Sequence, residues 1–336
     1  MPLTAAARED RFVGAFLGLA IGDALGFPLQ GVPASSLAQL PSLAEDFAHR
    51  PRGKYAKGQF SDDTQLMLAV AQSVTAEGKV DGASVGAHLA WTWREGVLLS
   101  APRSLRDAAE RLAGGMPWVG AGAPAGVKDP SGLSRGLVVG LIQPEVLGRL
   151  PHDAGVVSVV THKDPACAAA TAAYARAVSL GLDERPRTAQ AFCEAVALAA
   201  GVHEPGLAGE LRQLPRLLSW DEDRAFALLR RVGLTASEAG AEGIPAHVYP
   251  VLLCALFASL KFTADYRTTI SKVLRQGGEV DVCAALAGGI LGAHLGTAVL
   301  PARLRRNVLY AEELAKAAIT LAQVHAKVAV PALVRR

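Results

Sequence analysis

The sequence predicts an all-α fold built as one domain. Apolar residues recur at helical spacing along most of the chain, and no stretch shows the sustained apolar–polar alternation of a half-buried strand. The 336 residues contain no internal repeat and no linker-like segment. The composition is 51% hydrophobic and 19% charged, which is typical of a large core and argues against disorder. We therefore expect a single domain over residues 1–336.

The apolar periodicity places the individual helices. Two segments rich in Gly and Pro, 28–58 and 114–132, are expected to be loops, and a loop as long as the second is usually functional. Helices are predicted over residues 11–20, 62–76, 80–93, 103–112, 166–180, 188–200, 207–218, 225–232, 248–262, 283–300 and 311–328.

Charge and cysteine usage exclude several classes of protein. The net charge is only +3, and no basic cluster stands out beyond the final Arg335-Arg336, so neither nucleic acid nor an anionic membrane is expected as a partner. The four cysteines lie in apolar, helix-like surroundings and form no C-x-x-C pair. Buried thiols of this kind favour a reducing compartment, and we expect a cytoplasmic protein.

Two apolar segments have the length of a membrane element. Residues 12–29 are interrupted by Asp23 and lack the cleavage site of a signal peptide. Residues 283–300 carry glycines at four-residue spacing, a pattern that also occurs between transmembrane helices. Because Ala and Gly dominate the second segment, we interpret it as a buried helix whose small residues allow close packing.

The stretch Ser61-Asp62-Asp63-Thr64 is interpreted as the start of a helix. Ser61 is a favourable N-cap, and acidic residues in a first turn interact well with the helix dipole. Two adjacent carboxylates also repel each other, and a cation would relieve that repulsion. Hard divalent ions such as Mg²⁺ take oxygen ligands of this kind. The motif is therefore either a simple cap or half of a metal site.

A second acidic helix start comes about 220 residues later. The sequence Gly277-Gly278-Glu279-Val280-Asp281 leads directly into the apolar segment 283–300. If the two starts face each other across one cleft, Asp62, Asp63, Glu279 and Asp281 form one carboxylate cluster. Two unrelated capped helices would explain the same residues.

Three further features belong to the candidate site. Asp23 lies in a glycine-rich run and is either a solvated turn residue or a buried acid near the cleft. The 114–132 loop offers backbone amides that can bind anionic groups such as phosphates. In Thr161-His162-Lys163-Asp164-Pro165, either Thr161 or Asp164 can cap the helix that follows.

With these motifs in this order, the chain resembles the ADP-ribosylglycohydrolase family over almost its whole length. The resemblance depends on four blocks: Gly14-Ala15-Phe16-Leu17-Gly18 with Gly22-Asp23-Ala24-Leu25-Gly26, then Ser61-Asp62-Asp63-Thr64, then Thr161-His162-Lys163-Asp164-Pro165, and finally Gly277-Gly278-Glu279-Val280-Asp281. Arg135 also matches an arginine in the ligand-loop region of the family.

The resemblance implies an orthogonal helical bundle with one or two Mg²⁺ or Mn²⁺ ions in a cleft. It also implies hydrolysis of the N- or O-glycosidic bond that joins ADP-ribose to a protein side chain or a small acceptor. Carried over to this sequence, the metal ligands would be Ser61, Asp62, Asp63, Glu279 and Asp281, the catalytic residues would be Asp62, Asp63 and Asp281, and the ligand-binding residues would be Asp23, Gly126, Ser131, Gly132, Arg135 and His162.

The chain departs from the family pattern at several positions. The late motif of the family is usually Asp-Thr-Asp-Thr, whereas this chain has Glu279-Val280-Asp281-Val282, and Val282 offers no oxygen ligand. Gln30 stands where many members have a glutamate. These departures favour an alternative, a protein that binds ADP-ribose or a related nucleotide without the usual two-metal catalysis. A metal-dependent phosphohydrolase acting on a nucleotide is a third hypothesis. The sequence leaves the linkage, the acceptor and the oligomeric state open.

Overall fold

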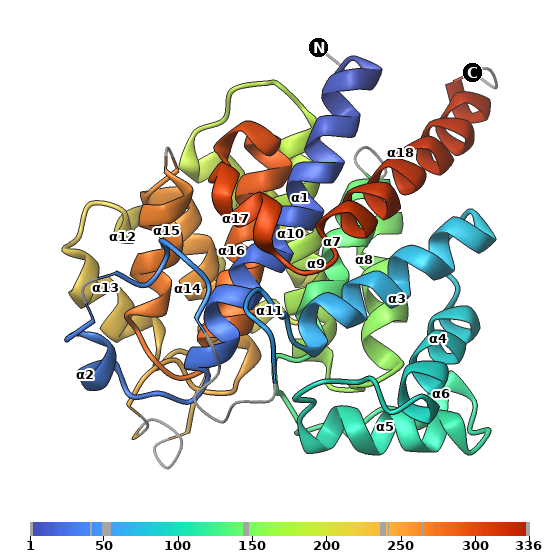
Figure 1. Cartoon of the computed structure of the whole chain (residues 1–336), viewed down its shortest axis with the longest axis horizontal. Helices are drawn as coiled ribbons and strands as arrows, with labels where there is room; N and C mark the ends of the chain where they lie inside the picture. Colours follow the sequence, from blue (N-terminus) through green and yellow to red (C-terminus); the bar gives the residue numbers. More distant parts are fainter. Residues whose placement is uncertain are drawn as a thin grey trace.

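The fold is all-α, as predicted. The computed structural model describes residues 3–40, 42–48, 55–143, 148–235, 240, 242–263 and 265–333. For residues 327–333 the description is limited to the backbone. Within these residues there is no strand, only two isolated β-bridges that pair loop segments. Figure 1 shows the helices packed at varied angles around a central pair, α1 and α16.

The elements follow one another along the chain with these bounds: α1 (Ala5–Gly26), η1 (Phe27–Leu29), α2 (Ala34–Leu37), α3 (Asp62–Glu77), α4 (Gly82–Arg94), α5 (Arg103–Ala113), α6 (Trp118–Ala121), η2 (Leu133–Arg135), α7 (Gly136–Ile142), α8 (Arg149–Val159), α9 (Pro165–Ser179), η3 (Leu180–Leu182), α10 (Ala189–Gly201), α11 (Pro205–Leu211), α12 (Leu214–Leu217), α13 (Glu222–Leu229), α14 (Val248–Lys261), α15 (Tyr266–Leu274), α16 (Val280–Leu295), η4 (Thr297–Val299), α17 (Ala302–Asn307) and α18 (Ala311–Leu333).

Helices α1 and α16 are antiparallel and touch backbone to backbone. A Cβ atom added to Gly18 would lie 2.3 Å from the carbonyl oxygen of Gly288, and one added to Gly22 would lie 2.1 Å from that of Ala284. Only glycine at these positions allows so close an approach. Gly26 lies against the backbone of Asp281 in the same way. The pair therefore brings the last turn of α1 to the first turn of α16.

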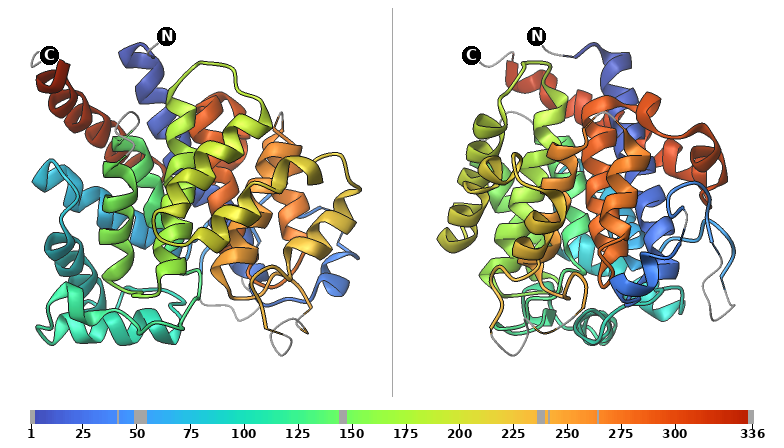
Figure 2. Two further views of the ribbon diagram at one scale, coloured as in Figure 1. Left: turned by 180° about the vertical axis from the view of Figure 1, so that it is seen from behind. Right: turned by 90° about the vertical axis from the view of Figure 1, so that its left-hand side faces the viewer.

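Other helices cover this central pair. Figure 2 shows α14 and α15 standing beside α16. Tyr266 at the start of α15 is fully buried, and its hydroxyl donates to the carbonyl oxygen of Gly18 at 2.7 Å. The four cysteines, Cys167, Cys193, Cys254 and Cys283, are buried free thiols, as the sequence predicted.

Several predicted boundaries were wrong. The first helix is longer than 11–20 because its glycines, which disfavour an isolated helix, here pack on α16. The predicted helix 207–218 is two short helices, α11 and α12, with Pro215 in the first turn of the second. Helix α15, capped by Asp265, was not predicted at all. Both predicted loops contain short helical turns, among them α2 and α6.

Helix α1 has the apolar composition of a membrane-spanning segment. In the described part of the chain, Ala5–Leu29 is the single helical segment that is long and apolar enough to cross a membrane. Its most apolar window is 89% buried inside the protein. Helix α16 is likewise buried along its length, because α1 covers its glycine face. Both segments therefore form helices of the protein core.

Candidate active site

The start of α3 is held by a carboxylate from α1. Ser61 is the N-cap, and its hydroxyl accepts from the amide of Asp63 at 3.2 Å. Asp23 is fully buried and accepts from the amides of Ser61 and Thr64 at 3.0–3.1 Å and from the Thr64 hydroxyl at 2.6 Å. Burial raises the pKa of Asp23, and these hydrogen bonds oppose that rise. Asp23 therefore fixes the position of the Asp62-Asp63 turn.

The start of α16 is held by loop segments on both sides. Gly277 and Gly278 have φ angles of 68° and 76°, a conformation that side chains rarely adopt. The amide of Ile244 donates to the Gly277 carbonyl at 2.8 Å, and the amide of Gly31 donates to the Gly278 carbonyl at 2.9 Å. The two glycines thus aim Glu279 and the first turn of α16 at the end of α1.

The two helix starts meet, as the sequence predicted. Asp62, Asp63 and Asp281 are buried, with exposed fractions of 5%, 4% and 1%. Burial raises the pKa of each well above its usual range, and repulsion within the group raises it further: Asp62 acts on Asp63, and Glu279 acts on Asp281. Asp63 Oδ1 and Asp281 Oδ1 are buried oxygens without a hydrogen-bond partner.

These oxygens are chemically suited to a hard divalent cation. Unpartnered buried carboxylate oxygens are costly, and a cation between the two helix starts would satisfy them. Val282 is buried and contributes no oxygen. Across the described residues, no group of three or more His, Cys, Asp or Glu side chains has the spacing of a formed metal site. The donor set therefore fits Mg²⁺ or Mn²⁺, while the side chains would have to close around the ion.

Gln30 occupies the rim of the cluster. Its amide nitrogen donates to Glu279 Oε2 at 3.4 Å, and its amide oxygen accepts from the Ser100 hydroxyl at 3.2 Å. Ser100 has a φ of 58°, a strained value for a residue with a side chain. Burial raises the pKa of Glu279, and the hydrogen bond from Gln30 opposes this. Gln30 thus binds the same carboxylate that was predicted as a metal ligand.

A chain of polar side chains runs from the interior to the loop over the cluster. Arg135 is buried to 1% exposure and donates to the Thr161 hydroxyl and to the Gly132 carbonyl. The Thr161 hydroxyl is 2.9 Å from His162 Nδ1, and His162 Nε2 is 2.9 Å from Asp129 Oδ2. Because Asp129 accepts, Nε2 carries a proton, and in the neutral ring Thr161 donates to Nδ1. The imidazole orientation is fixed at both nitrogens.

Asp129 is a site residue that the sequence reasoning missed. Burial would raise its pKa, but the hydrogen bond and electrostatic interaction with His162, together with the Ser131 hydroxyl, hold that pKa well below its usual range. Its negative charge also acts on Asp62 and Glu279, so it lies near the cluster. The signal available in the sequence was an acid within the glycine-rich 114–132 loop.

The other predicted ligand-binding residues lie along this loop. The Gly126 amide donates to Asp164 Oδ2 at 2.7 Å, and Asp164 is the N-cap of α9. Gly126 is exposed, with a φ of 96°. A side chain at Gly132 would collide with the Arg135 guanidinium. Asp23 and Arg135 use their polar atoms largely inside the protein, so they position the site, and direct contact of either with a ligand remains a prediction.

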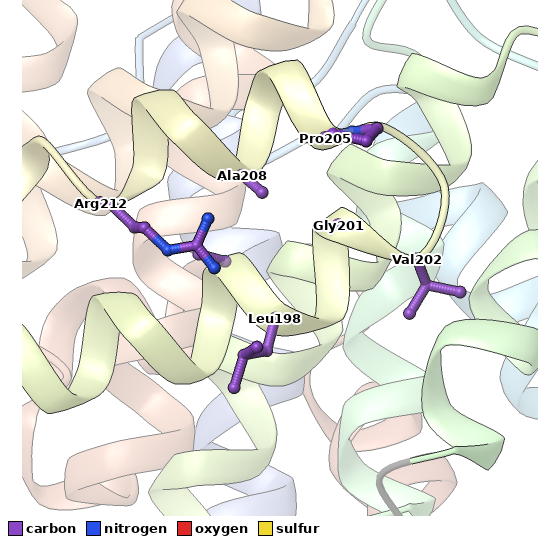
Figure 3. Close-up of a pocket in the computed structure, with 7 residues that line it drawn as sticks. Leu198, Gly201, Val202, Pro205, Ala208 and Arg212 are labelled. Carbon is purple, nitrogen blue, oxygen red and sulfur yellow. The ribbon is translucent and has the colours of Figure 1, made fainter.

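Two cavities lie away from the carboxylates. One, of about 400 Å³, is a surface hollow between α10 and α11. Figure 3 shows Leu198 and Val202 on one side and Arg212 reaching across from the end of α11. Arg212 is already paired with Glu194 at 2.9 Å, and the rest of the lining is largely alkyl. It offers no group for bond cleavage, so we place the candidate site at the carboxylates on chemical grounds.

Comparison with known proteins identifies the family to which the chain is related. The model of the ADP-ribosylglycohydrolase family matches residues 4–330. An uncharacterized protein of Archaeoglobus fulgidus is 27% identical over 95% of this chain and 98% of its own length. The ADP-ribosyl-[dinitrogen reductase] glycohydrolase of Rhodospirillum rubrum is 35% identical over 25% of this chain and 28% of its own. The ADP-ribosylarginine hydrolase Tri1 of Pseudomonas putida is 34% identical over 26% and 22%.

A solved structure shares the fold. It is described as an ADP-ribosylglycohydrolase-related protein complex, is 24% identical, and superposes with a TM-score of 0.72 over 95% of this chain and 99% of its own. At that identity the likeness concerns the fold alone. The matched residues 4–330 include both acidic helix starts and the whole 114–132 loop. The chain therefore belongs to the ADP-ribosylglycohydrolase family.

Proposed function

We propose that this protein is a metal-dependent ADP-ribosyl hydrolase, which cleaves the glycosidic bond between ADP-ribose and a modified side chain or small acceptor. The observation that carries the proposal is the meeting of α3 and α16. Their first turns bring Asp63 and Asp281 together with one buried, unpartnered carboxylate oxygen each. Buried carboxylate oxygens in folded proteins normally have a partner, so these two favour a cation ligand over a role as helix caps alone.

The metal ligands in this proposal are Ser61, Asp62, Asp63, Glu279 and Asp281. A bound divalent ion would supply a positive charge that orients the ribose hydroxyls and sharpens the nucleophilicity of water. Asp23 holds the α3 start in place through its bonds to Ser61 and Thr64. Gly277 and Gly278 hold the α16 start, so the ligand oxygens come from two rigidly placed turns.

In the proposed reaction, water is the nucleophile and a carboxylate of the cluster is the base. The water oxygen bonds to the anomeric carbon of the ribose, and the bond from that carbon to the acceptor nitrogen or oxygen breaks. A carboxylate of the cluster (Asp62, Asp63 or Asp281) takes a proton from the water, and the leaving group recovers a proton. His162, oriented by Thr161 and Asp129, lies where the loop that carries Gly126, Ser131 and Gly132 meets α9.

The second candidate is a protein that binds ADP-ribose without hydrolysing it. The observation in its favour is Gln30, whose amide hydrogen-bonds Glu279 and cannot act as a base. Val282 adds to it, because its buried side chain lacks the oxygen of a threonine. In this case the loop and His162 would still hold the nucleotide, while water would not be activated.

Turnover on defined substrates tests the proposal. Purified protein with Mg²⁺ or Mn²⁺ is incubated with ADP-ribosylarginine and ADP-ribosylserine peptides, and free ADP-ribose is measured by chromatography. We expect release, with a loss of at least about 100-fold in kcat/KM for Asp63→Asn, which corresponds to about 2.7 kcal/mol. Asp107→Asn, at a carboxylate 44% exposed on α5, serves as the matched control and should leave turnover unchanged.

Other outcomes select other functions. Binding of ADP-ribose by folded protein without release from either peptide would overturn the hydrolase proposal in favour of the binding protein. Release of phosphate or AMP from a nucleotide, instead of ADP-ribose from a peptide, would favour a phosphohydrolase.

A further inference from the structure

The segment that joins α4 to α5 borders the candidate active site. Its residues 97–101, which we call the rim segment, pass the first turn of α3, where the Leu99 carbonyl accepts from the Asp62 amide at 3.1 Å. The Ser100 hydroxyl of the same segment donates to the amide oxygen of Gln30 at 3.2 Å. Because these bonds attach it to the start of α3 and to Gln30, the rim segment forms one edge of the site.

The side chain of Gln65 in α3 holds the rim segment in an extended form. Its Nε2 donates to the Val97 carbonyl at 2.7 Å, and its Oε1 accepts from the Leu99 amide at 2.9 Å. In a parallel sheet, a neighbouring strand makes the same pair of bonds, to the carbonyl of one residue and to the amide two positions later. The Gln65 amide thus takes the place of a strand on one edge of the segment, and the backbone groups of Leu98 point to the other edge.

The edge of the rim segment that carries the Leu98 backbone is open. Among the residues that the structure describes, none bonds the amide or the carbonyl of Leu98. The side chain of Val97, beside it, is 43% exposed. Residues 97–101 include no charged side chain and no proline, the residues that commonly block a strand edge. An open edge of this kind can pair with the backbone of another polypeptide.

A polypeptide suits this edge better than a small acceptor does. The backbone of an extended chain supplies both a donor for the Leu98 carbonyl and an acceptor for the Leu98 amide. A paired chain would lie about 4.8 Å from the rim segment, which is itself bonded to the turn that carries Asp62. A long side chain of the paired polypeptide can therefore reach over the segment toward the carboxylates.

From this geometry we propose that the rim segment docks an extended stretch of an acceptor polypeptide, which pairs with the amide and the carbonyl of Leu98 beside the residue that carries ADP-ribose. The inference rests on the proposed hydrolase function and deepens it, because it makes the substrate a modified peptide or protein instead of a modified free amino acid. The exposed Val97 side chain would contact an apolar side chain of the acceptor. Since backbone pairing does not depend on side-chain identity, the acceptor sequence would be recognised only weakly.

Hydrolysis of matched substrates by the wild-type protein tests the proposal. One substrate is a short ADP-ribosylated peptide, and the other is the free amino acid with the same modification, for both the arginine and the serine linkage. Because the peptide alone forms the backbone hydrogen bonds, we expect its kcat/KM to be at least about tenfold higher, mainly through a lower KM.

Peptides that are N-methylated at every second residue locate these hydrogen bonds. In an extended chain, successive N–H groups point to opposite edges, so the two alternating patterns of methylation block opposite edges of the peptide. We expect one pattern to lower kcat/KM to the value of the modified amino acid, and the other to leave it close to that of the unmethylated peptide.

Leu98→Pro tests the contribution of the protein, because proline has no backbone N–H. Leu98→Ala is the matched control, which shortens the same side chain but keeps the amide. We expect the ratio of kcat/KM for the peptide to that for the amino acid to fall about fivefold in Leu98→Pro and to stay near the wild-type ratio in Leu98→Ala. Thermal unfolding shows whether each variant is folded, and the methylated peptides test the wild-type protein independently.

The outcomes separate this inference from the proposed function. Equal kcat/KM for the peptide and the modified amino acid, an equal effect of the two methylation patterns, or an unchanged ratio in folded Leu98→Pro would overturn the docking of a polypeptide while leaving the hydrolase in place. Absence of ADP-ribose release from both substrates would contradict the hydrolase function, and the inference that depends on it would be overturned as well.

Discussion

At the scale of single residues, Asp23 decides where the candidate site forms. Its two oxygens receive two amides and a hydroxyl from the first turn of α3, and no solvent reaches it. A carboxylate in this position stabilises the helix start through the dipole and satisfies otherwise unpaired amides. Because Asp23 accepts from these amides, the side chains of Asp62 and Asp63 are not needed to cap the helix, and their oxygens are available for a cation.

Substitution of Gln30 tests how an additional negative charge beside Glu279 affects the stability of the carboxylate cluster. In Gln30→Glu, a carboxylate would face Glu279, whose Oε2 lies 3.4 Å from the present amide nitrogen. At pH 8 without metal we expect the free energy of unfolding to fall by about 1 kcal/mol from like-charge repulsion. Mg²⁺ should then stabilise the variant more than it stabilises the wild type.

The measurement is urea unfolding of both proteins, with and without Mg²⁺, followed by circular dichroism. Gln143→Glu is a partial control, because Gln143 also donates to a carboxylate, that of Asp153, but away from the cluster. An equal effect of Mg²⁺ on Gln30→Glu and wild type would contradict a cation site next to Glu279.

The residues of the site differ in how far sequence could predict them. Ser61, Asp62 and Asp63 were identified because a cap and its first turn are local, and the chemistry of adjacent carboxylates is visible in the sequence itself. The role of Asp129 depends on His162, which is 33 residues away and reaches it only after the loop is folded against α9. No local pattern records such a contact.

At the scale of elements, the α1–α16 contact aligns the two acidic helix starts. Because backbone touches backbone along four turns, a small change in separation would move Asp23 and Asp281 relative to each other. The same contact explains why α1 was predicted too short. Its glycines are unfavourable in an isolated helix, and the packing that compensates for them comes from residues more than 250 positions later.

Replacing one of these glycines should separate the pair. In Gly22→Ala, the new Cβ would lie 2.1 Å from the Ala284 carbonyl oxygen, so the helices must move apart. We expect a loss of about 3 kcal/mol in the free energy of unfolding, measured by urea titration.

Gly209→Ala is the matched control, since nothing lies within 4 Å of a Cβ at that position in α11. It should stabilise the protein by about 0.5–1 kcal/mol, because alanine favours the helix. If both variants behaved alike, steric contact between α1 and α16 would not be the reason for the glycines.

The packing of α18 on α1 should depend on pH through His325. Its ring stacks on Phe12 with centroids 6.1 Å apart, and burial, with repulsion from Arg8, lowers its pKa to about 4. The unfolded residue has a pKa of about 6.5, so between these values the unfolded chain binds more protons. The stabilisation is therefore present above pH 6.5 and is lost as the pH falls toward 4.

We expect the wild type to lose on the order of 2 kcal/mol more than His325→Phe between pH 6.5 and pH 4.5. The comparison is made by urea unfolding at several pH values. Parallel stability curves for the two proteins would show that His325 keeps an ordinary pKa in the folded state.

At the scale of the whole molecule, the buried residues form one continuous apolar core that includes α1, α9, α14 and α16. We therefore expect the chain to unfold as a single domain, with one calorimetric transition whose calorimetric and van't Hoff enthalpies agree. Two separated transitions, or a van't Hoff enthalpy well below the calorimetric one, would show that the predicted single domain over 1–336 is wrong.

The fold class was predictable because helical periodicity and the absence of strand alternation extend over the whole chain, and neither depends on long-range contacts. Element ends were predicted less well. Short helices such as α12 and α15 contain few apolar turns, and their starts at Gln213 and Asp265 were not used as signals. The meeting of α3 and α16 was a hypothesis from chemistry, because two acidic turns could share a cation, and two unrelated capped helices explained the same residues equally well.

The most direct test of the central claim is calorimetric titration of the metal-free protein with ADP-ribose, with and without Mg²⁺, beside Asp62→Asn. If the two helix starts form one cation site, ADP-ribose binds tightly only when Mg²⁺ is present, and the variant loses that dependence together with most of the affinity. Equal affinity with and without Mg²⁺, unchanged in Asp62→Asn, would contradict the account.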